Sequence, residues 1–329
     1  MKKTGVVMVC LILAGVLLWL QPWQDTQTEV NYRLKWLFNT SVAGDIWADE
    51  GGFFEANGLA VAVKEGSPEK NAINELELGH AQFGVASADQ VIRALDRGAD
   101  IVVIAQLFQV NPMQWIYRAE KGEIRTPADL KGRKTGITYG GNDEIIMKTL
   151  LASAGIREQD VMLTGVRFDF TPFLKKEVDV WPVYRNSQGV ILEDRLAKGG
   201  ETALFFNPAD HGVRFVANSV VTTRSLLETD PDLVKRFLGA LLRGWEAAMA
   251  PANEARVLEA VQKRNTGLQG AVLKEQLEET RRLVKPGPDV RIGTIDKDAW
   301  KQTEAVLVRE KQVKKAVQIE SRLVHMAGH

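Results

Sequence analysis

The run YRLKWLFNTS at residues 32–41 decides how the chain folds. Its first residues alternate between apolar and polar types, which predicts a strand over 32–38. The side chains at 39–41 are of the kind that cap helix N-termini, so we expect a helix over 42–57. A glycine ends that helix directly before the apolar run 59–63, a second strand. Strand, helix and strand in this order form one βαβ unit.

The alternation of strands and helices continues along the chain, with glycines at the joints, and predicts that the first lobe is an open α/β lobe with a largely parallel sheet. The pattern of strands and helices begins again after Gly122, which marks a second lobe. From Asp230 the chain is predicted to form amphipathic helices that pack on the first lobe. Pro182 predicts an edge position or a strand end. The further predicted strands cover 81–85, 101–105, 134–138, 161–166, 178–184, 203–206 and 214–216. The further predicted helices cover 71–78, 89–96, 126–130, 143–154, 171–177, 231–249, 253–263, 270–284 and 297–313.

The composition narrows the functional class. A length of 329 residues with 45% hydrophobic content supports a sizeable core and predicts two domains. Lys+Arg 42 balance Asp+Glu 42, and this zero net charge argues against a nucleic-acid partner. One cysteine and four scattered histidines exclude a disulfide framework and the common zinc and iron–sulfur motifs. We therefore expect no metal and no cofactor, and a small-molecule ligand in a cleft between two domains.

The N-terminus has the pattern of an export signal. Two lysines precede an uncharged apolar run at 6–20. No small-x-small cleavage site follows, so we assign 1–22 to an uncleaved signal anchor and 23–31 to a polar linker. The alternative is that residues 6–20 form a buried core helix. Cys10 lies inside the run rather than behind it, which argues against a lipoprotein.

Polar and aromatic side chains gather in the loops that follow the predicted strands. Open parallel sheets bind ligands where loops leave the carboxyl ends of strands. An aromatic ring can stack on a flat heterocycle, and amide or carboxylate side chains can bind the edge of that heterocycle. We therefore predict a planar, nitrogen-bearing ligand in contact with Trp36, Asn39, Ser87, Asp89, Gln109, Asn111, Gly140, Asn142, Trp181, Tyr184 and Asn186.

Several of these residues could have a structural role instead of contacting the ligand. Trp36 could belong to the core, and Asp89 could serve only as a helix N-cap. Trp181 and Tyr184 stand three positions apart on one strand end, so one of them is expected to be structural, and we favour Tyr184 for the cleft. The Gly-Gly pair that begins at Gly140 could hold an anion or form a tight turn. Because it lacks the Lys-Ser/Thr of a P-loop, phosphate binding is the less favoured interpretation.

Several motifs keep the order and spacing of a known family. WLFNTSVAG at 36–44 and EGGFFEANGL at 50–59 closely resemble the opening of ABC-transporter substrate-binding proteins for thiamine pyrimidine precursors, and of their relatives for taurine, aliphatic sulfonates and riboflavin. The similarity continues through motifs at 78–85, 126–133, 170–173, 178–179, 230–238 and 244–245. It covers nearly all of the chain behind the predicted anchor.

The resemblance implies a type II periplasmic-binding-protein fold, α/β with two lobes and the ligand cleft between them. Lobe 1 would comprise 32–116 and 215–329, and lobe 2 would comprise 117–214, with crossing strands near Tyr117 and His211–Phe215. The resemblance also implies a monomer in the periplasm or on the extracytoplasmic face, tethered to the inner membrane by its N-terminal segment. Such a protein presents its ligand to an ABC permease with its ATPase.

Two departures from the family bear on ligand and activity. Relatives that bind pyrimidines tend to carry a histidine where this chain has Val42. Fungal pyrimidine synthases with this fold use a cysteine-rich motif, whereas Cys10 is the only cysteine here, and no nucleophile elbow occurs. We therefore predict a binding protein for a thiamine-precursor-like heterocycle, not an enzyme. The alternatives are a taurine or sulfonate binder with Arg185 as anion contact, a riboflavin binder, and a synthase-like enzyme or sensor lobe.

Overall fold

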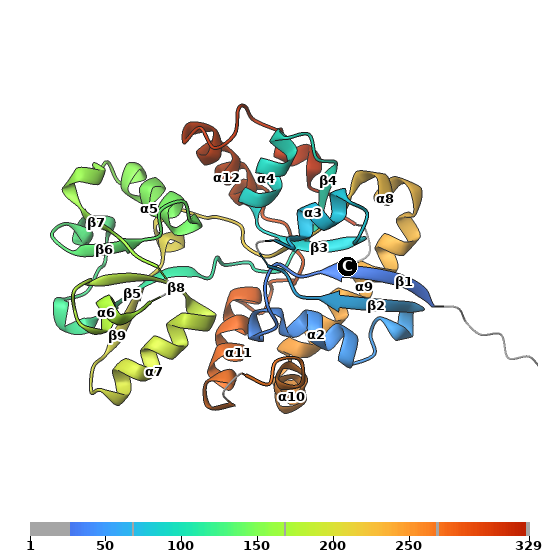
Figure 1. Cartoon of the computed structure of the whole chain (residues 1–329), viewed down its shortest axis with the longest axis horizontal. Coiled ribbons are helices and arrows are strands. Elements are labelled where there is room, and N and C mark those ends of the chain that lie inside the picture. Colours follow the sequence, from blue (N-terminus) through green and yellow to red (C-terminus); the bar gives the residue numbers. More distant parts are fainter. Residues whose placement is uncertain (1–26, 68, 168, 268–269, 327–329) are drawn as a thin grey trace, which may run out of the picture.

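The computed structural model describes residues 27–67, 69–167, 169–267 and 270–326. Over these residues the chain forms two five-stranded sheets, each flanked by its own helices, which lie side by side as two lobes (Figure 1). The predicted two-lobed α/β fold is thereby confirmed. The predicted signal anchor lies outside the described residues. Within those residues, no helix is both long and apolar enough to span a membrane.

The sheet of the first lobe has the strand order β2-β1-β3-β10-β4. Its strands are β1 (Thr28–Arg33), β2 (Leu59–Lys64), β3 (Phe83–Ala86), β4 (Ile101–Gln106) and β10 (Ser219–Thr223). β1 runs parallel to β2 and β3, whereas β10 lies antiparallel between β3 and β4. The expectation of a largely parallel sheet is therefore wrong for β10, because this strand returns from the second lobe and does not follow a crossover helix.

The sheet of the second lobe has the strand order β7-β6-β8-β5-β9. Its strands are β5 (Met113–Arg118), β6 (Lys134–Ile137), β7 (Met162–Gly165), β8 (Val180–Tyr184) and β9 (Ala203–Phe206). β8 lies inside the sheet and Pro182 is the third of its 5 residues, so both positions predicted from Pro182, a sheet edge or a strand end, are wrong. β6 pairs with β8 at Val180, before the proline, and the missing N–H of Pro182 therefore interrupts no bond to β6.

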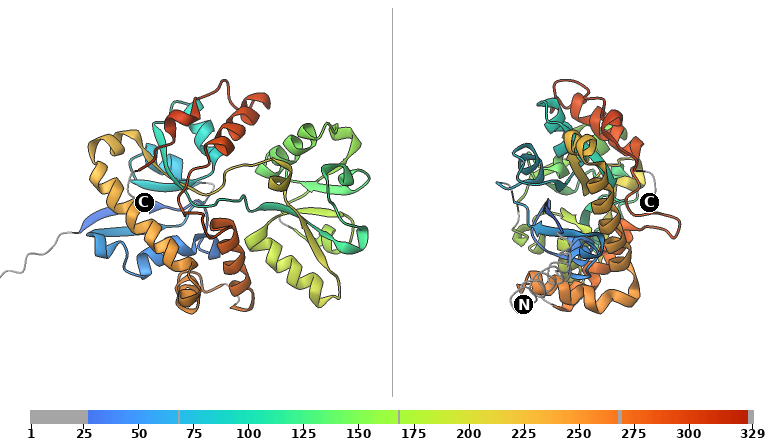
Figure 2. Two further views of the ribbon diagram at one scale, coloured as in Figure 1. Left: turned by 180° about the vertical axis from the view of Figure 1, so that it is seen from behind. Right: turned by 90° about the vertical axis from the view of Figure 1, so that its right-hand side faces the viewer.

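Two layers of helices cover the first sheet (Figures 1 and 2). Helices α2 and α9 pack on one face, and α3, α4 and α12 pack on the other. The predicted packing of the four C-terminal helices on the first lobe is confirmed, because α9, α10 and α11 contribute residues to the core beneath one face and α12 contributes residues beneath the other. The helices are α2 (Ala43–Glu50), α3 (Ala72–Glu77), α4 (Ala88–Asp96), α5 (Asn142–Ser153), α6 (Thr171–Leu174), α7 (Val190–Lys198), α8 (Arg224–Thr229), α9 (Pro231–Met249), α10 (Glu254–Arg264), α11 (Gly270–Val284) and α12 (Lys297–Arg309).

The chain passes between the two sheets through residues 107–112 and returns through residues 207–218. We propose that the lobe boundaries lie in these two segments. The predicted boundary at 214/215 falls within the second segment, whereas the one predicted at 116/117 falls within β5, which pairs with β8 and β9 in the second sheet. The strand expected over 214–216 is absent, because these residues run through the second crossing without a sheet partner, and β10 follows them. Residues 28–31, which the sequence assigned to the linker, form the start of β1 and pair with β2.

Two glycines allow α2 and α9 to cross at close range. A Cβ atom on Gly44 would lie 1.9 Å from the ring of Trp245, and one on Gly244 would lie 2.5 Å from the Cβ of Ala48. A side chain at either position would collide with the opposite helix. Both glycines belong to the motifs that carry the family resemblance, so part of that resemblance reflects packing and not ligand binding.

A carboxylate is buried where these helices meet the sheet. Asp45 is 1% exposed, and its Oδ1 accepts hydrogen bonds from the Tyr32 hydroxyl at 2.5 Å and from the Trp245 indole at 3.3 Å. Its Oδ2 has no hydrogen-bond partner among the described residues. Burial outweighs the two hydrogen bonds and raises the pKa of Asp45 to about 7. The folded chain therefore keeps a proton on Asp45 at pH values where the unfolded chain has lost it.

This proton predicts a pH-dependent stability. Because the folded pKa of Asp45 lies above the unfolded value of 3.8, its contribution is complete below that pH and is lost as the pH rises through about 7. The side chain at position 45 cannot titrate in the Asp45→Asn variant. Between pH 3.8 and about 7, the unfolding free energy of the variant should therefore rise relative to that of wild type by up to about 1.4 kcal/mol per pH unit.

Urea unfolding followed by tryptophan fluorescence, at about pH 5 and about pH 8, measures the difference between the two proteins. We expect the variant to gain on wild type at the higher pH. A difference in unfolding free energy that is the same at both pH values would contradict the assignment of a buried, protonated carboxyl.

Candidate ligand-binding site

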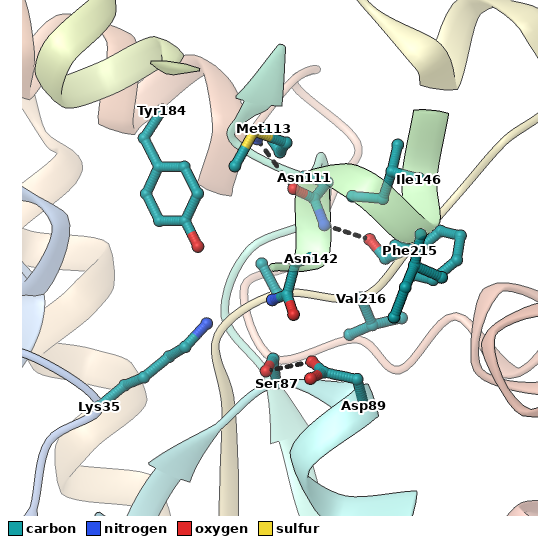
Figure 3. Close-up of a pocket in the computed structure, with 12 residues that line it drawn as sticks. Lys35, Ser87, Asp89, Asn111, Met113, Asn142, Ile146, Tyr184, Phe215 and Val216 are labelled. Carbon is teal, nitrogen blue, oxygen red and sulfur yellow. Dashed lines mark hydrogen bonds between the residues drawn. The ribbon is translucent and has the colours of Figure 1, made fainter. Parts of the chain in front are cut away.

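A pocket lies where the two lobes meet, beside the loops at the strand ends (Figure 3). Both lobes and both crossing segments contribute side chains to its wall. The residues that line it are Lys35, Ser87, Asp89, Asn111, Met113, Asn142, Ile145, Ile146, Tyr184, Phe215, Val216 and Ala217. A ligand held here would contact both lobes at once, as expected for a site between two lobes.

Ser87 and Asp89 form the wall on the first lobe, at the N-terminus of α4. Ser87 is the N-cap, in a capping box with Gln90, so the alternative that Asp89 holds the N-cap position is wrong. The Ser87 hydroxyl donates to Asp89 Oδ1 at 2.5 Å, and Asp89 Oδ2 pairs with Arg93 at 3.2 Å. Both carboxylate oxygens of Asp89 therefore already have partners within the chain.

Asn111 belongs to the first crossing segment and contacts the second. Its Oδ1 accepts a hydrogen bond from the Met113 backbone N–H at 2.8 Å, and its Nδ2 donates to the Phe215 carbonyl at 3.0 Å (Figure 3). The amide thus joins one crossing segment to the other at the base of the pocket. The sequence pattern placed Asn111 at the site, and the structure adds that its polar atoms hold the two crossings together.

The wall on the second lobe comes from Asn142, the first residue of α5, and Tyr184, the last residue of β8. Both side chains extend toward the centre of the pocket, where the Tyr184 hydroxyl and the Asn142 amide face the first lobe (Figure 3). Ile145 and Ile146 of α5 add apolar surface. An aromatic ring, an amide and aliphatic side chains together suit a small, partly apolar ligand.

Gly140 does not line the pocket, and its backbone serves a turn. Its φ of +80° lies in the left-handed region that glycine favours, and its N–H donates to Glu144 at 2.7 Å. Asp143 closes the same loop, because its Oδ2 accepts a hydrogen bond from the Thr138 N–H at 2.5 Å. Burial raises the pKa of the Asp143 carboxyl. These bonds favour the tight-turn interpretation of the Gly-Gly pair over an anion site.

Trp181 and Tyr184 separate as the strand geometry requires. Trp181 is 1% exposed and packs against Phe170 and Phe173, with ring centroids 6.2 Å apart in both pairs. It therefore belongs to the core of the second lobe and does not reach the pocket, whereas Tyr184 does. Alternate residues of a strand point to opposite faces, so a separation of three positions places the two rings on different sides.

Three further predicted residues do not line the pocket. Asn39 caps a helical turn, with its Oδ1 accepting from the Ser41 N–H at 2.7 Å. Gln109 donates to the carbonyls of Gln106 and Thr294 at 2.8 and 3.0 Å. Trp36 is 50% exposed, so the core interpretation of this tryptophan is wrong.

Asn186 joins the lobes in a polar contact beside the pocket. It is fully buried in the π-helical turn Arg185–Gly189 of the second lobe, and its Nδ2 donates to Ser41 at 3.0 Å and to Thr280 of α11 at 2.9 Å. Arg185 extends the same contact, because it pairs with Glu279 at 3.1 Å. We call the contact of this turn with Ser41 and α11 the interlobe seam.

The contacts of Arg185 are all made at or beside the interlobe seam. Its guanidinium also pairs with Glu193 at 3.1 Å and lies over the Phe205 ring, 4.0 Å from the centroid. It does not line the pocket. The structure therefore does not support Arg185 as the anion contact of a sulfonate binder.

Several lining residues were not predicted. The apolar ones come from α5, from the first residue of β5 and from the second crossing segment, where no local pattern marks a side chain as facing a cavity. Lys35 has a signal in the sequence, because it lies in the same strand-end loop as Trp36. Across the described residues, no group of three or more His, Cys, Asp or Glu side chains converges to hold a metal.

Comparison with known proteins identifies relatives. A protein-family model described as NMT1/THI5 like matches residues 39–255. A protein assigned to thiamine biosynthesis in Haemophilus influenzae is 28% identical over 233 residues, 69% of this chain and 71% of that protein. A formylaminopyrimidine-binding protein of Halalkalibacterium halodurans is 24% identical over 211 residues, 63% of this chain and 62% of that protein. A riboflavin-binding protein of Chloroflexus aurantiacus is 25% identical over 299 residues, 85% of this chain and 80% of that protein.

A solved structure agrees with the fold. The periplasmic aliphatic sulphonate binding protein of Escherichia coli superposes with a TM-score of 0.69 at 19% sequence identity, covering 92% of this chain and 94% of that one. This similarity confirms the two-lobed periplasmic-binding-protein fold.

The interlobe seam generates a prediction about the ligand-free protein. Asn186→Ala removes two hydrogen bonds between the lobes, a buried one to Thr280 and a partly buried one to Ser41, each of which contributes about 1 kcal/mol. The variant should therefore populate more open arrangements, and small-angle X-ray scattering without ligand should give a larger radius of gyration than for wild type.

Asn253→Ala is the matched control, because the Asn253 side chain donates to Ala247 within the first lobe. It should leave the scattering curve unchanged. Superimposable curves for wild type and Asn186→Ala would show that the seam does not hold the lobes together.

Proposed function

The chain belongs to the NMT1/THI5-like family, and from this premise we propose that it is the extracytoplasmic solute-binding component of an ABC importer. Its ligand is a small, planar nitrogen heterocycle such as a thiamine pyrimidine precursor. The observation that carries this proposal is the pocket itself, which is built from both lobes and from both crossing segments. A ligand bound there stabilises one arrangement of the lobes.

The chemistry of the pocket supports a ring-shaped ligand. Tyr184 offers an aromatic face, and such a face contributes about 0.5–1.5 kcal/mol to ring stacking beyond area burial. Met113, Ile145 and Ile146 add apolar contacts. Asn142 offers both donors and an acceptor to the edge of a heterocycle.

The relatives support the same class of ligand. One binds formylaminopyrimidine and another is assigned to thiamine biosynthesis, which favours a pyrimidine. The riboflavin-binding relative supports riboflavin as the alternative heterocycle. A taurine or sulfonate ligand is the less favoured alternative, because two of the relatives are named for heterocycles and Arg185, the anion contact predicted for a sulfonate, is held by Glu193 and Glu279.

The proposed protein acts by binding and not by chemistry. The lobes close on the ligand, and the closed form presents it to a permease with its ATPase. A monomeric state and a membrane tether formed by residues 1–22 are parts of this proposal. Trp36 also remains a proposed ligand contact, because its ring is half exposed next to the lining residue Lys35.

Isothermal titration with hydroxymethylpyrimidine, formylaminopyrimidine, riboflavin and taurine tests the proposal. We expect heat with at least one heterocycle, and a loss of affinity of about tenfold or more in Tyr184→Ala, because the variant loses the stacking face. Binding of taurine with no heat from any heterocycle would contradict the proposed ligand class. Conversion of a heterocycle to a product would favour the enzyme alternative.

Tyr139→Ala is the matched control for Tyr184→Ala. Tyr139 also belongs to the second lobe but is 64% exposed and does not line the pocket. Its variant should bind like wild type. Equal losses in both variants would indicate that the pocket of Figure 3 is not the binding site.

A further inference from the structure

We propose that Lys35 makes the pocket selective for a ligand that carries an anionic group in addition to its ring. This inference rests on the proposed binding function and names the chemistry that the site would select. The group would be a carboxylate, a sulfonate or a phosphate, since each presents several oxygens to a cluster of donors.

Lys35 extends from a loop that the first lobe holds in place. The preceding Leu34 is fully buried and its N–H donates to the Lys64 carbonyl at 2.8 Å. The carbonyl of the following Trp36 accepts from the Gly66 N–H at 3.1 Å. A Cβ on Gly66 would lie 2.2 Å from the Leu34 carbonyl oxygen, so the two loops are in close backbone contact. The stem of Lys35 therefore starts from a fixed position at the pocket.

The Lys35 ammonium has no partner in the described part of the chain. Its side chain makes no ion pair and no hydrogen bond there, although it is partly buried in the pocket wall. The other cations near the strand ends are paired: Arg33 with Glu75 at 2.8 Å, Arg93 with Asp89 at 3.2 Å, Lys148 with Glu144 at 3.0 Å and Arg185 with Glu279 at 3.1 Å. A partly desolvated cation without a counterion attracts an anionic ligand.

The carboxylate that lines the pocket does not neutralise Lys35. Asp89 is 7% exposed, and its two oxygens are bound by Ser87 and Arg93. Its charge is therefore compensated on its own helix. The positive charge of Lys35 remains uncompensated on the side of the pocket that faces the second lobe.

Lys35 also converges with neutral donors from the opposite lobe. In Figure 3 its Nζ points into the space between the Tyr184 hydroxyl and the Asn142 side chain. An ammonium, a phenol and an amide can together bind the oxygens of one anionic group. Because these donors come from different lobes, the anion would also favour the closed arrangement.

Matched ligand pairs test this inference. Riboflavin and riboflavin 5′-phosphate form one pair, and hydroxymethylpyrimidine and its phosphate form the other, so that each pair shares its ring and differs in charge. Isothermal titration of wild type should show the charged member of at least one pair binding about tenfold or more tightly than the neutral member.

Three variants test whether Lys35 causes the preference for the charged ligand. Lys35→Met keeps the aliphatic stem without the charge and should bind both members of the pair equally, while Lys35→Arg should keep most of the preference. Lys64→Met is the control, because Lys64 is exposed on β2 and does not line the pocket, and it should behave like wild type. Unchanged binding of the neutral member by Lys35→Met shows that the variant is folded.

The possible failures are distinguishable. Tighter binding of the neutral member, or a charge preference that survives in Lys35→Met, overturns the role of Lys35 and leaves the proposed function intact. Binding of taurine alone, lost in Lys35→Met, contradicts the heterocyclic ligand but keeps the anion contact. No binding of any of these ligands contradicts the proposed function and the inference together.

Discussion

Asn111 joins the two segments through which the chain passes between its lobes, and the pocket is built on that junction. Its amide accepts a hydrogen bond from the N–H of Met113 at the start of β5 and donates one to the Phe215 carbonyl on the second crossing, so the two crossings are held together beside the pocket. The walls of the pocket belong to different lobes, and Asn186 joins those lobes again at the seam. Under the proposed function, a ligand that contacts both walls therefore favours the closed arrangement of the lobes.

The elements of the fold differ in how far the sequence predicts them. α9 has the bounds expected from its amphipathic pattern, 231–249, and β2 extends one residue beyond the expected 59–63, because such elements are encoded by local periodicity. β10 was not predicted, since a strand that returns from the other lobe depends on contacts made at long range. The expected helix over 42–57 is shorter because α2 ends at Glu50 and a turn follows.

The candidate site likewise contains residues that the sequence predicts and residues that only the structure reveals. Five residues of the pocket wall follow predicted strands and were predicted as ligand contacts on that ground: Ser87, Asp89, Asn111, Asn142 and Tyr184. The same pattern also selected Trp181 and Asn39, because residue type and position do not reveal that a ring faces the core or that an amide caps its own turn. Lys35 was not predicted as a ligand contact, because the sequence prediction rested on aromatic rings, amides and carboxylates. Only the packed structure shows that its ammonium lines the pocket without a partner among the described residues.

A crystal structure of the chain with its bound ligand is the most direct test of the claim that both lobes hold the ligand together. We predict density between Tyr184 and the N-terminus of α4, with an anionic group of the ligand about 2.7–3.2 Å from Lys35 Nζ. A ligand bound to the surface of one lobe, with the space between Lys35 and Tyr184 free of it, would contradict this account of the site.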